Sequence, residues 1–252
     1  MEIPRETITD LLQKELEKHP KKTEAIKTVK AKLHNIAAPY LDRLDYQKAS
    51  QDLERAFSTG DRKSVDETCI QFLQAHQSTK ERIPYMHDFY TYITNKIGDA
   101  CSIIDLACGL NPFVIPLVGF PPSLTYFAYD IHSPRIRLIT QLFSGLGIHA
   151  AAEIRDILLQ PPQQKASAAF LFKEAHRMEK RRKGATRDLI AALTVNTLFI
   201  SLPNHSLNGK YNLRSRMRKL TDASIQGLGS ILEVEEFPSE TLFTIGLKHG
   251  KA

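Results

Sequence analysis

The sequence predicts an α/β fold: a largely parallel, Rossmann-like sheet that follows a helical N-terminal region. Between residues 102 and 247, short apolar runs alternate with helical stretches, which is typical of βαβ units. Before residue 97, apolar residues recur at helical spacing without strand-like alternation. Residues 102–112 read as a buried strand, a tight glycine turn and a helix start, which predicts a ligand at that strand's carboxyl end.

The composition indicates a globular protein with an excess of positive charge. The 252 residues are 42% hydrophobic and 25% charged, with a net charge of +6, and the charge favours a polyanionic partner such as nucleic acid. The start of the chain resembles neither a signal nor a transit peptide, and no apolar run is long enough for a bilayer, so we expect a cytoplasmic protein without membrane contact. Cys69, Cys101 and Cys108 lack CxxC spacing, which predicts free thiols and no metal site.

The N-terminal region should contain four helices, with apolar faces at 8–16, 26–36, 49–57 and 65–73. Gly60 is placed to end the third helix, and Asp61 to cap the fourth. Ser78 and Glu81 have the spacing of a capping box for a further helix, in whose first turn Pro84 must lie unless the helix begins later. We expect a helical domain at 1–77 and a second domain at 78–252.

Seven strands are expected after residue 100. They fall near 102–106, 125–129, 149–153, 167–172, 197–202, 231–236 and 241–247, with helices after Pro112 and near 135–145 and 185–193. The last two strands should form an antiparallel hairpin that turns at Pro238 and Ser239. A terminal hairpin of this kind favours a methyltransferase-type sheet over the more fully parallel sheet of a dinucleotide dehydrogenase.

Acidic residues follow the first three predicted strands. Asp105 and Asp130 end the first two, and Asp156 follows the third. Asp130 lies about 20 residues after the glycine turn, where an acid accepts both ribose hydroxyls, and Asp156 can accept a hydrogen bond from an adenine amine. Each acid alone could equally be a loop residue or a helix cap. A site for the pyrophosphate of a dinucleotide usually needs several glycines in this turn, and here only Gly109 is present. S-adenosylmethionine, which has no phosphate, therefore fits the turn better than a dinucleotide.

Five short segments resemble a known family, the aminoglycoside-resistance 16S rRNA (guanine-N7) methyltransferases of the Arm/Rmt group. They are HQSTKER at 76–82, IDLACGLNP at 104–112, DIH at 130–132, DIL at 156–158 and FK at 172–173. The resemblance implies a class I S-adenosylmethionine-dependent methyltransferase fold with an N-terminal helical domain that binds 16S rRNA in the 30S subunit. It also implies methylation of N7 of the decoding-site guanosine 1405, with aminoglycoside resistance as the result.

The resemblance further implies the residues of a cofactor site. Position by position, they are His76, Ser78, Arg82 on the methionine carboxylate, Ala107 and Gly109 on the methionine side, Asp130 on the ribose, Asp156 and Ile157 on the adenine, and Phe172 near the methyl group. No general base is expected, because guanine N7 has a free lone pair and bears no proton. Lys173 is the candidate for contact with the target or a phosphate, and a structural role at a strand end is its alternative.

Basic residues in both parts of the chain are candidates for rRNA contact. They are Lys27, Lys30, Lys32, Arg62, Lys63, Lys210, Arg214 and Arg216. The run 210–219 suggests an RNA-facing loop, whereas the basic run 177–187 could equally be a solvated helix face.

Three segments depart from the family pattern, all on the acceptor side of the expected site. Residues 174–177 replace an apolar segment, a family glutamine is replaced in the region of Arg181 and Arg182, and residues 204–210 lack an arginine and a glycine-rich loop. Two alternatives therefore stay open: a methyltransferase for another RNA nucleotide or a small molecule, and a non-catalytic ribosome-binding protein. We expect a monomer.

Overall fold

The predicted seven-stranded sheet is present in the computed structural model, which describes residues 3–37, 44–98, 102–206 and 209–248. The strands lie in the order β3-β2-β1-β4-β5-β7-β6. Their bounds are β1 Ser102–Leu106, β2 Thr125–Asp130, β3 His149–Ile154, β4 Lys165–Phe172, β5 Thr194–Pro203, β6 Gly229–Glu236 and β7 Glu240–Leu247. Strands β1 to β5 pair in parallel, and β7 runs antiparallel to both β5 and β6, which confirms the terminal hairpin.

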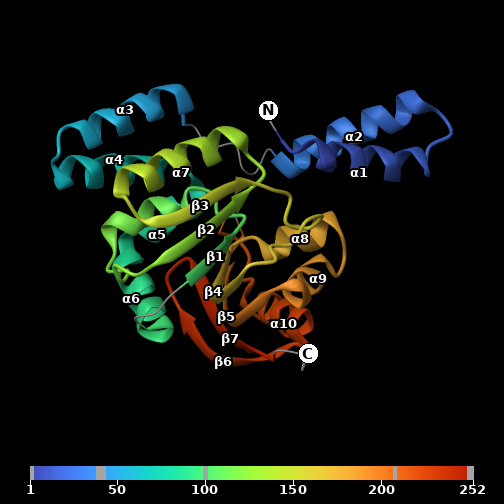
Figure 1. The fold of residues 1–252 in the computed structure, drawn as a ribbon. Coiled ribbons are helices and arrows are strands. Elements are labelled where there is room, and N and C mark those ends of the chain that lie inside the picture. The colour runs from blue at the N-terminus through green and yellow to red at the C-terminus, as the bar shows by residue number, and fades with distance from the viewer. Residues whose placement is uncertain (1–2, 38–43, 99–101, 207–208, 249–252) are drawn as a thin grey trace.

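Helices cover both faces of the sheet (Figure 1). They are α1 Arg5–Leu16, α2 Lys22–Ala37, α3 Tyr46–Ser58, α4 Arg62–Ala75, α5 Gln77–Arg82, α6 Met86–Ile97, α7 Ser133–Leu146, α8 Ala175–Arg181, α9 Ala185–Ala192 and α10 Arg214–Ile225. One hydrophobic core joins α3, α4, α6 and α7 to one face of the sheet, and a second core joins α8, α9 and α10 to the other face. Helices α1 and α2 pack against each other as a hairpin beside this body (Figure 1).

The central strands are buried on both faces, as a parallel sheet between two helical layers requires. In β4, Phe170 packs into the core below α7, and its neighbour Leu171 packs into the core below α8 and α9. This burial explains why the strands appear in the sequence as continuous apolar runs.

The ends of the N-terminal helices follow local chemistry. Asp61 caps α4, as predicted, and its side chain accepts a hydrogen bond from the Lys63 backbone nitrogen at 3.0 Å. Gly60 has a φ of +67°, the left-handed conformation expected of a glycine after a helix. The predicted domain boundary coincides with the start of α5, but α3 and α4 share a core with α6 and α7. The division into two domains therefore stays a prediction.

The predicted capping box is wrong. Ser78 lies inside α5, and the N-cap position is His76, whose side chain makes no capping hydrogen bond. Glu81 instead forms an ion pair with Lys173, with 2.7 Å between the carboxylate and the ammonium nitrogen. Glu81 therefore pairs with a residue far along the chain, Lys173, instead of the backbone at Ser78. Pro84 lies in a short 3-10 turn, Ile83–Tyr85, so α6 begins later, which is the second arrangement the sequence allowed.

Two other elements differ from expectation. The segment after Gly109 forms a 3-10 helix, Asn111–Leu117, rather than an α-helix. Pro116 lies inside it and has no backbone N–H for a continuing helix. The run 210–219 is not a single loop, because Arg214 begins α10. Cys69 and Cys108 are buried free thiols, and Cys101 lies outside the described residues.

Candidate cofactor and active site

The turn after β1 brings together β1, β2 and α5 at the carboxyl edge of the sheet. Ala107 and Gly109 both have positive φ angles, +53° and +55°. The Gly109 backbone nitrogen donates to Asp130 Oδ2 at 3.0 Å. A Cβ built on Gly109 would lie 3.3 Å from His76 Cε1, and the left-handed backbone would strain any other residue there. Glycine therefore lets His76, with Ser78 3.4 Å away from its Nδ1, approach the turn.

Asp130 is buried at the end of β2, directly beside this turn. Its side chain, 2% exposed, accepts from three donor atoms. They are the backbone nitrogens of Gly109 at 3.0 Å and His132 at 2.8 Å, and one guanidinium nitrogen of Arg135, which reaches both oxygens at 3.0 and 3.1 Å. Asp130 therefore fixes the turn from the end of β2, and its contact with a ribose stays a prediction.

Asp156 follows β3 at the same edge and is 1% exposed. Thr7 Oγ1 of α1 donates to it at 2.7 Å, and the Leu158 backbone nitrogen at 3.2 Å. Arg181, the last residue of α8, donates through two nitrogens at 2.8 and 2.5 Å. Ile157, the other predicted adenine contact, is buried beside Asp156. The first N-terminal helix thus reaches the predicted adenine end of the site.

Arg82 is buried in a charge network with Glu240, the first residue of β7. The guanidinium donates to both Glu240 oxygens, at 2.9 and 2.7 Å, and to Asn111 Oδ1 at 3.2 Å. Its carbon lies 4.3 Å from the Phe89 ring centroid and 4.8 Å from that of Phe172, within the range of cation–π contact. Arg82 and Phe172, predicted beside the methionine end, are therefore in contact with each other.

Burial and neighbouring charges oppose each other at two acids of this edge. Burial would raise the pKa of Glu240, but the charges of Arg82 and Lys173 lower it to about 2. Burial raises the pKa of Asp105 to about 7, although hydrogen bonds from Tyr126 at 2.6 Å and Asn111 at 2.9 Å oppose the rise. Glu240 is therefore anionic at neutral pH, while Asp105 is only partly ionised.

Lys173 follows β4 with a φ of +56°, an unusual conformation for a residue other than glycine. Its side chain is 7% exposed. The ammonium nitrogen lies 2.7 Å from Glu81 Oε2 and 3.7 Å from Glu240 Oε1, and it donates to Ser239 Oγ at 3.0 Å. Non-glycine residues in this conformation cluster at functional sites. The same contacts also give Lys173 a structural role, so both interpretations stay open.

Residues 174–177, one of the segments that depart from the family pattern, are buried at Glu174 and Ala175 and partly buried at His176 and Arg177. Burial raises the pKa of Glu174 to about 8, although the nearby Arg177 lowers it. Burial lowers the pKa of His176 to about 4, and the charges of Arg177, Lys180 and Arg216 lower it further. Both side chains are therefore predominantly uncharged at pH 7. With these two side chains uncharged, the segment carries less charge than its sequence suggests and is closer to the apolar segment that it replaces.

The predicted rRNA contacts lie in two places. Lys27 and Lys30 are exposed on α2, while Lys32 forms an ion pair with Glu15 of α1 at 2.7 Å. Arg62 and Lys63, at the start of α4, pair with Asp66 and Glu67 of the same helix at 2.9 and 3.8 Å. These cations come from separate helices.

The second group lies beyond β5. Lys210 and Arg216 are exposed, and Arg214 contacts Glu236 of β6 at 3.5 Å. Because Arg214 and Arg216 belong to α10, they lie on a helix rather than on the loop that the sequence suggested.

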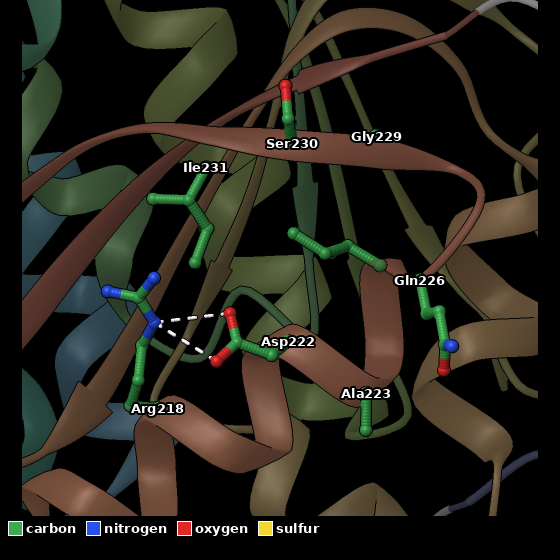
Figure 2. A pocket seen from close by; sticks show the side chains of 8 residues that line it. Arg218, Asp222, Ala223, Gln226, Gly229, Ser230 and Ile231 are labelled. Atoms are coloured by element: carbon green, nitrogen blue, oxygen red, sulfur yellow. Dashed lines mark hydrogen bonds and ion pairs between the residues drawn. The ribbon is translucent and has the colours of Figure 1, made fainter.

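A shallow hollow lies between α10 and β6 (Figure 2). Arg218 and Asp222, joined by an ion pair at 3.1 Å, line one side, and Gly229 and Ile231 line another. Gly229 pairs with Leu247 at the end of β7 opposite to Glu240, so the hollow lies near the amino edge of the parallel strands. None of the predicted site residues lines it, and ligands of such sheets bind at the carboxyl edge.

The partners of the site residues were not predicted from the sequence. Thr7, Arg135 and Glu240 contact Asp156, Asp130 and Arg82. For Glu240, a usable signal existed, because it is an acid at the head of an otherwise apolar strand. No feature of the sequence indicated that Thr7 would contact Asp156. Within the described ranges, no cluster of His, Cys, Asp or Glu could hold a metal ion. Those ranges also include no helix with the length and apolar character needed to cross a bilayer.

Comparison with known proteins gives consistent results. The chain is 31% identical over 187 residues to the 16S rRNA (guanine(1405)-N(7))-methyltransferase of Frankia casuarinae. The aligned residues cover 73% of this chain and 66%, slightly under two thirds, of that relative. It is 25% identical over 205 residues to a protein of the same name from Serratia marcescens, covering 81% of this chain and 76% of that one.

Solved structures show the same fold. The 16S rRNA methyltransferase RmtF, in complex with S-adenosyl-L-homocysteine, superposes with a TM-score of 0.84 at 24% identity, over 98% of this chain and 92% of that one. The 16S rRNA methylase RmtB superposes with a TM-score of 0.80 at 21% identity, with the same coverage. Residues 2–226 match the sequence pattern described as ribosomal RNA methyltransferase (FmrO). The chain belongs to this family.

Proposed function

We propose that the protein transfers a methyl group from S-adenosylmethionine to N7 of guanosine 1405 in the 16S rRNA of the 30S subunit, and thereby confers aminoglycoside resistance. The observation that supports this most directly is the family match over residues 2–226, together with the shared name of its relatives. We further propose that it acts as a cytoplasmic monomer.

The carboxyl edge of the sheet fits the cofactor. The turn at Ala107 and Gly109 offers backbone without a Cβ at the point of closest approach, and His76 and Ser78 lie against it. Asp130 lies beside this turn at the end of β2, the position from which an acid of such a sheet accepts ribose hydroxyls. Asp156 and Ile157 then face the adenine, and Arg82 and Phe172 the methionine and methyl end.

The chemistry requires little proton transfer from the protein. The cofactor supplies an electrophilic methyl group on a sulfonium, and guanine N7 attacks it with a lone pair that bears no proton. The contribution of this chain is then to align the acceptor with the methyl group and to stabilise the charges. Lys173, held next to Glu81 and Glu240, provides a fixed cation at the end of β4 for the target or an adjacent phosphate.

The proposed rRNA contacts are electrostatic. Lys27, Lys30 and Lys32 on α2, with Arg62 and Lys63 on α4, would bind phosphates from the N-terminal side. Lys210, Arg214 and Arg216 would do so beyond β5. Binding to phosphates releases counterions from the RNA, and the free energy gained from this release decreases as the salt concentration rises. Binding should therefore fall steeply with ionic strength.

Incubation of the purified protein with radiolabelled S-adenosylmethionine and intact 30S subunits tests the activity. We expect label in 16S rRNA from wild-type protein and none from Asp130→Ala. Label in another RNA or in a small molecule only would support the alternative acceptors. Tight binding to 30S subunits without any transfer would support a non-catalytic role.

A further inference from the structure

The carboxylate of Asp156 has no acceptor capacity left in this structure. Four donor atoms bond to it: Thr7 Oγ1, the Leu158 backbone nitrogen and two guanidinium nitrogens of Arg181. A carboxylate can accept about four hydrogen bonds. Asp130 also receives four hydrogen bonds, but a single nitrogen of Arg135 makes two of them. A ligand amine can therefore reach Asp156 only if one of the present donors leaves.

The three groups that donate to Asp156 differ in how easily they can leave. The Leu158 nitrogen belongs to the chain two residues further on and cannot move far. Thr7 is fully buried, with 0% exposure. The Arg181 side chain is 16% exposed, ends α8 and has a long flexible stem. Water can solvate its charge as soon as it turns outward, so Arg181 is the donor that leaves at least cost.

We propose that Arg181 sets the cofactor affinity by competing with the adenine amine for Asp156. The inference rests on the proposed assignment of Asp156 to adenine. Without cofactor, the guanidinium balances a carboxylate that would otherwise be buried and unpaired, an expensive state. When the cofactor binds, the adenine N–H replaces a guanidinium N–H, and Arg181 turns to solvent. Part of the adenine binding energy is spent on this exchange.

Calorimetric titration of the full chain with S-adenosylhomocysteine tests the competition. Arg181→Gln keeps an amide donor but removes the charge and the second contact. We expect it to bind on the order of 3- to 10-fold more tightly than wild type, the worth of one hydrogen bond. The matched control is Arg182→Gln, because Arg182 is the next residue and pairs with Asp188 at 2.6 Å, away from Asp156. It should bind as wild type does.

A second ligand shows whether the effect acts through the amine. S-inosylhomocysteine presents a carbonyl oxygen, an acceptor, at the position of the adenine amine, so Arg181→Gln should not tighten its binding as it does for S-adenosylhomocysteine. Equal or weaker binding of S-adenosylhomocysteine by Arg181→Gln, or equal tightening for both ligands, would overturn the proposal.

Two further variants separate the possible failures. Asp156→Leu, which removes both acceptor oxygens, should weaken S-adenosylhomocysteine binding. If it does not, the adenine assignment itself fails, whatever Arg181 does. If circular dichroism shows that Arg181→Gln is unfolded, Thr7→Val removes another donor of the same carboxylate with little change of shape. This variant should also bind more tightly, and unchanged or weaker binding would count against the competition.

Discussion

At the scale of single residues, Arg82, Glu240 and Lys173 form a buried charge cluster at the carboxyl edge. Arg82 ends α5, Glu240 begins β7, and Lys173 follows β4, so the cluster joins three separate parts of the chain. The anion lies between the two cations, at 2.7 Å from Arg82 and 3.7 Å from Lys173. Removing the Glu240 charge leaves the buried Arg82 guanidinium without its carboxylate partner, whereas Lys173 keeps Glu81.

Glu240→Gln should therefore destabilise the protein by about 3 kcal/mol at pH 7, the cost of breaking a buried ion pair. The native pKa of about 2 lies below the ordinary 4.5, so the ionised form stabilises the fold above pH 4.5. This contribution is lost as the pH falls from 4.5 towards 2. Urea unfolding at pH 7 and pH 3 measures both values. A difference between variant and wild type that does not shrink at pH 3 would contradict the assignment.

Glu174 should show the opposite pH dependence. Its native pKa of about 8 lies above the ordinary 4.5, so between these values the native state holds a proton that the unfolded state releases. Stability should fall as the pH rises through this range. Glu174→Gln should remove the decline and be more stable than wild type at pH 8, by roughly 4 kcal/mol, with little difference at pH 4.5. If the free energies of unfolding of the two proteins changed in parallel with pH across this range, the raised pKa of Glu174 would be refuted.

At the scale of elements, helix α3 is held against α7 by close packing. Gly145 of α7 lies below Phe57 of α3, and Ser50 of α3 donates to the Gln141 side chain of α7 at 2.8 Å. A Cβ on Gly145 would meet the Phe57 ring, because three ring atoms lie within 2.5 Å of its position. Helices α3 and α4 thus belong to the same packed body as the sheet.

Gly145→Ala should destabilise the protein by about 1 kcal/mol, although alanine favours a helix, because the Phe57 ring must move. Gly119→Ala is the matched control, since a Cβ there meets nothing within 4 Å. Thermal unfolding of both variants tests the packing of α3 on α7. Equal melting temperatures for the two variants would show that Phe57 does not press on Gly145.

Elements with a strong local signal were predicted well. The seven strands and the Asp61 cap follow from apolar runs and from side chains that bond to adjacent backbone. The capping box failed because Glu81 has a more favourable partner 92 residues away. The basic run beyond β5 was assigned to a loop, because its charges mask the helical spacing of Met217, Thr221 and Ser224, which are buried on α10.

At the scale of the whole molecule, the N-terminal helices and the sheet edge meet at one place. Thr7 of α1 donates to Asp156 at the end of β3, so the α1–α2 hairpin lies next to the proposed cofactor site (Figure 1). Cations on α2 would then bind rRNA while the sheet edge holds the cofactor. The sequence predicted the acids of this site but not the contacts between distant segments that hold them.

The double variant Lys27→Glu, Lys30→Glu should weaken binding to 30S subunits at least about 10-fold, since two phosphate contacts become repulsive. It should leave S-adenosylhomocysteine affinity unchanged. Lys165→Glu, at the exposed start of β4 on the opposite edge, is the control and should bind 30S subunits as wild type does. Filter binding and calorimetry give the two affinities. Equal loss in both variants would mean that only net charge matters.

The position of the methyl group tests the central claim most directly. 16S rRNA from 30S subunits treated with the protein and S-adenosylmethionine can be reduced with borohydride and cleaved with aniline, which breaks the chain at N7-methylguanosine. Primer extension then locates the break. We predict one new stop, adjacent to guanosine 1405, that is absent with Asp130→Ala. A stop at another guanosine, or methyl transfer without any cleavage, would contradict the proposed reaction.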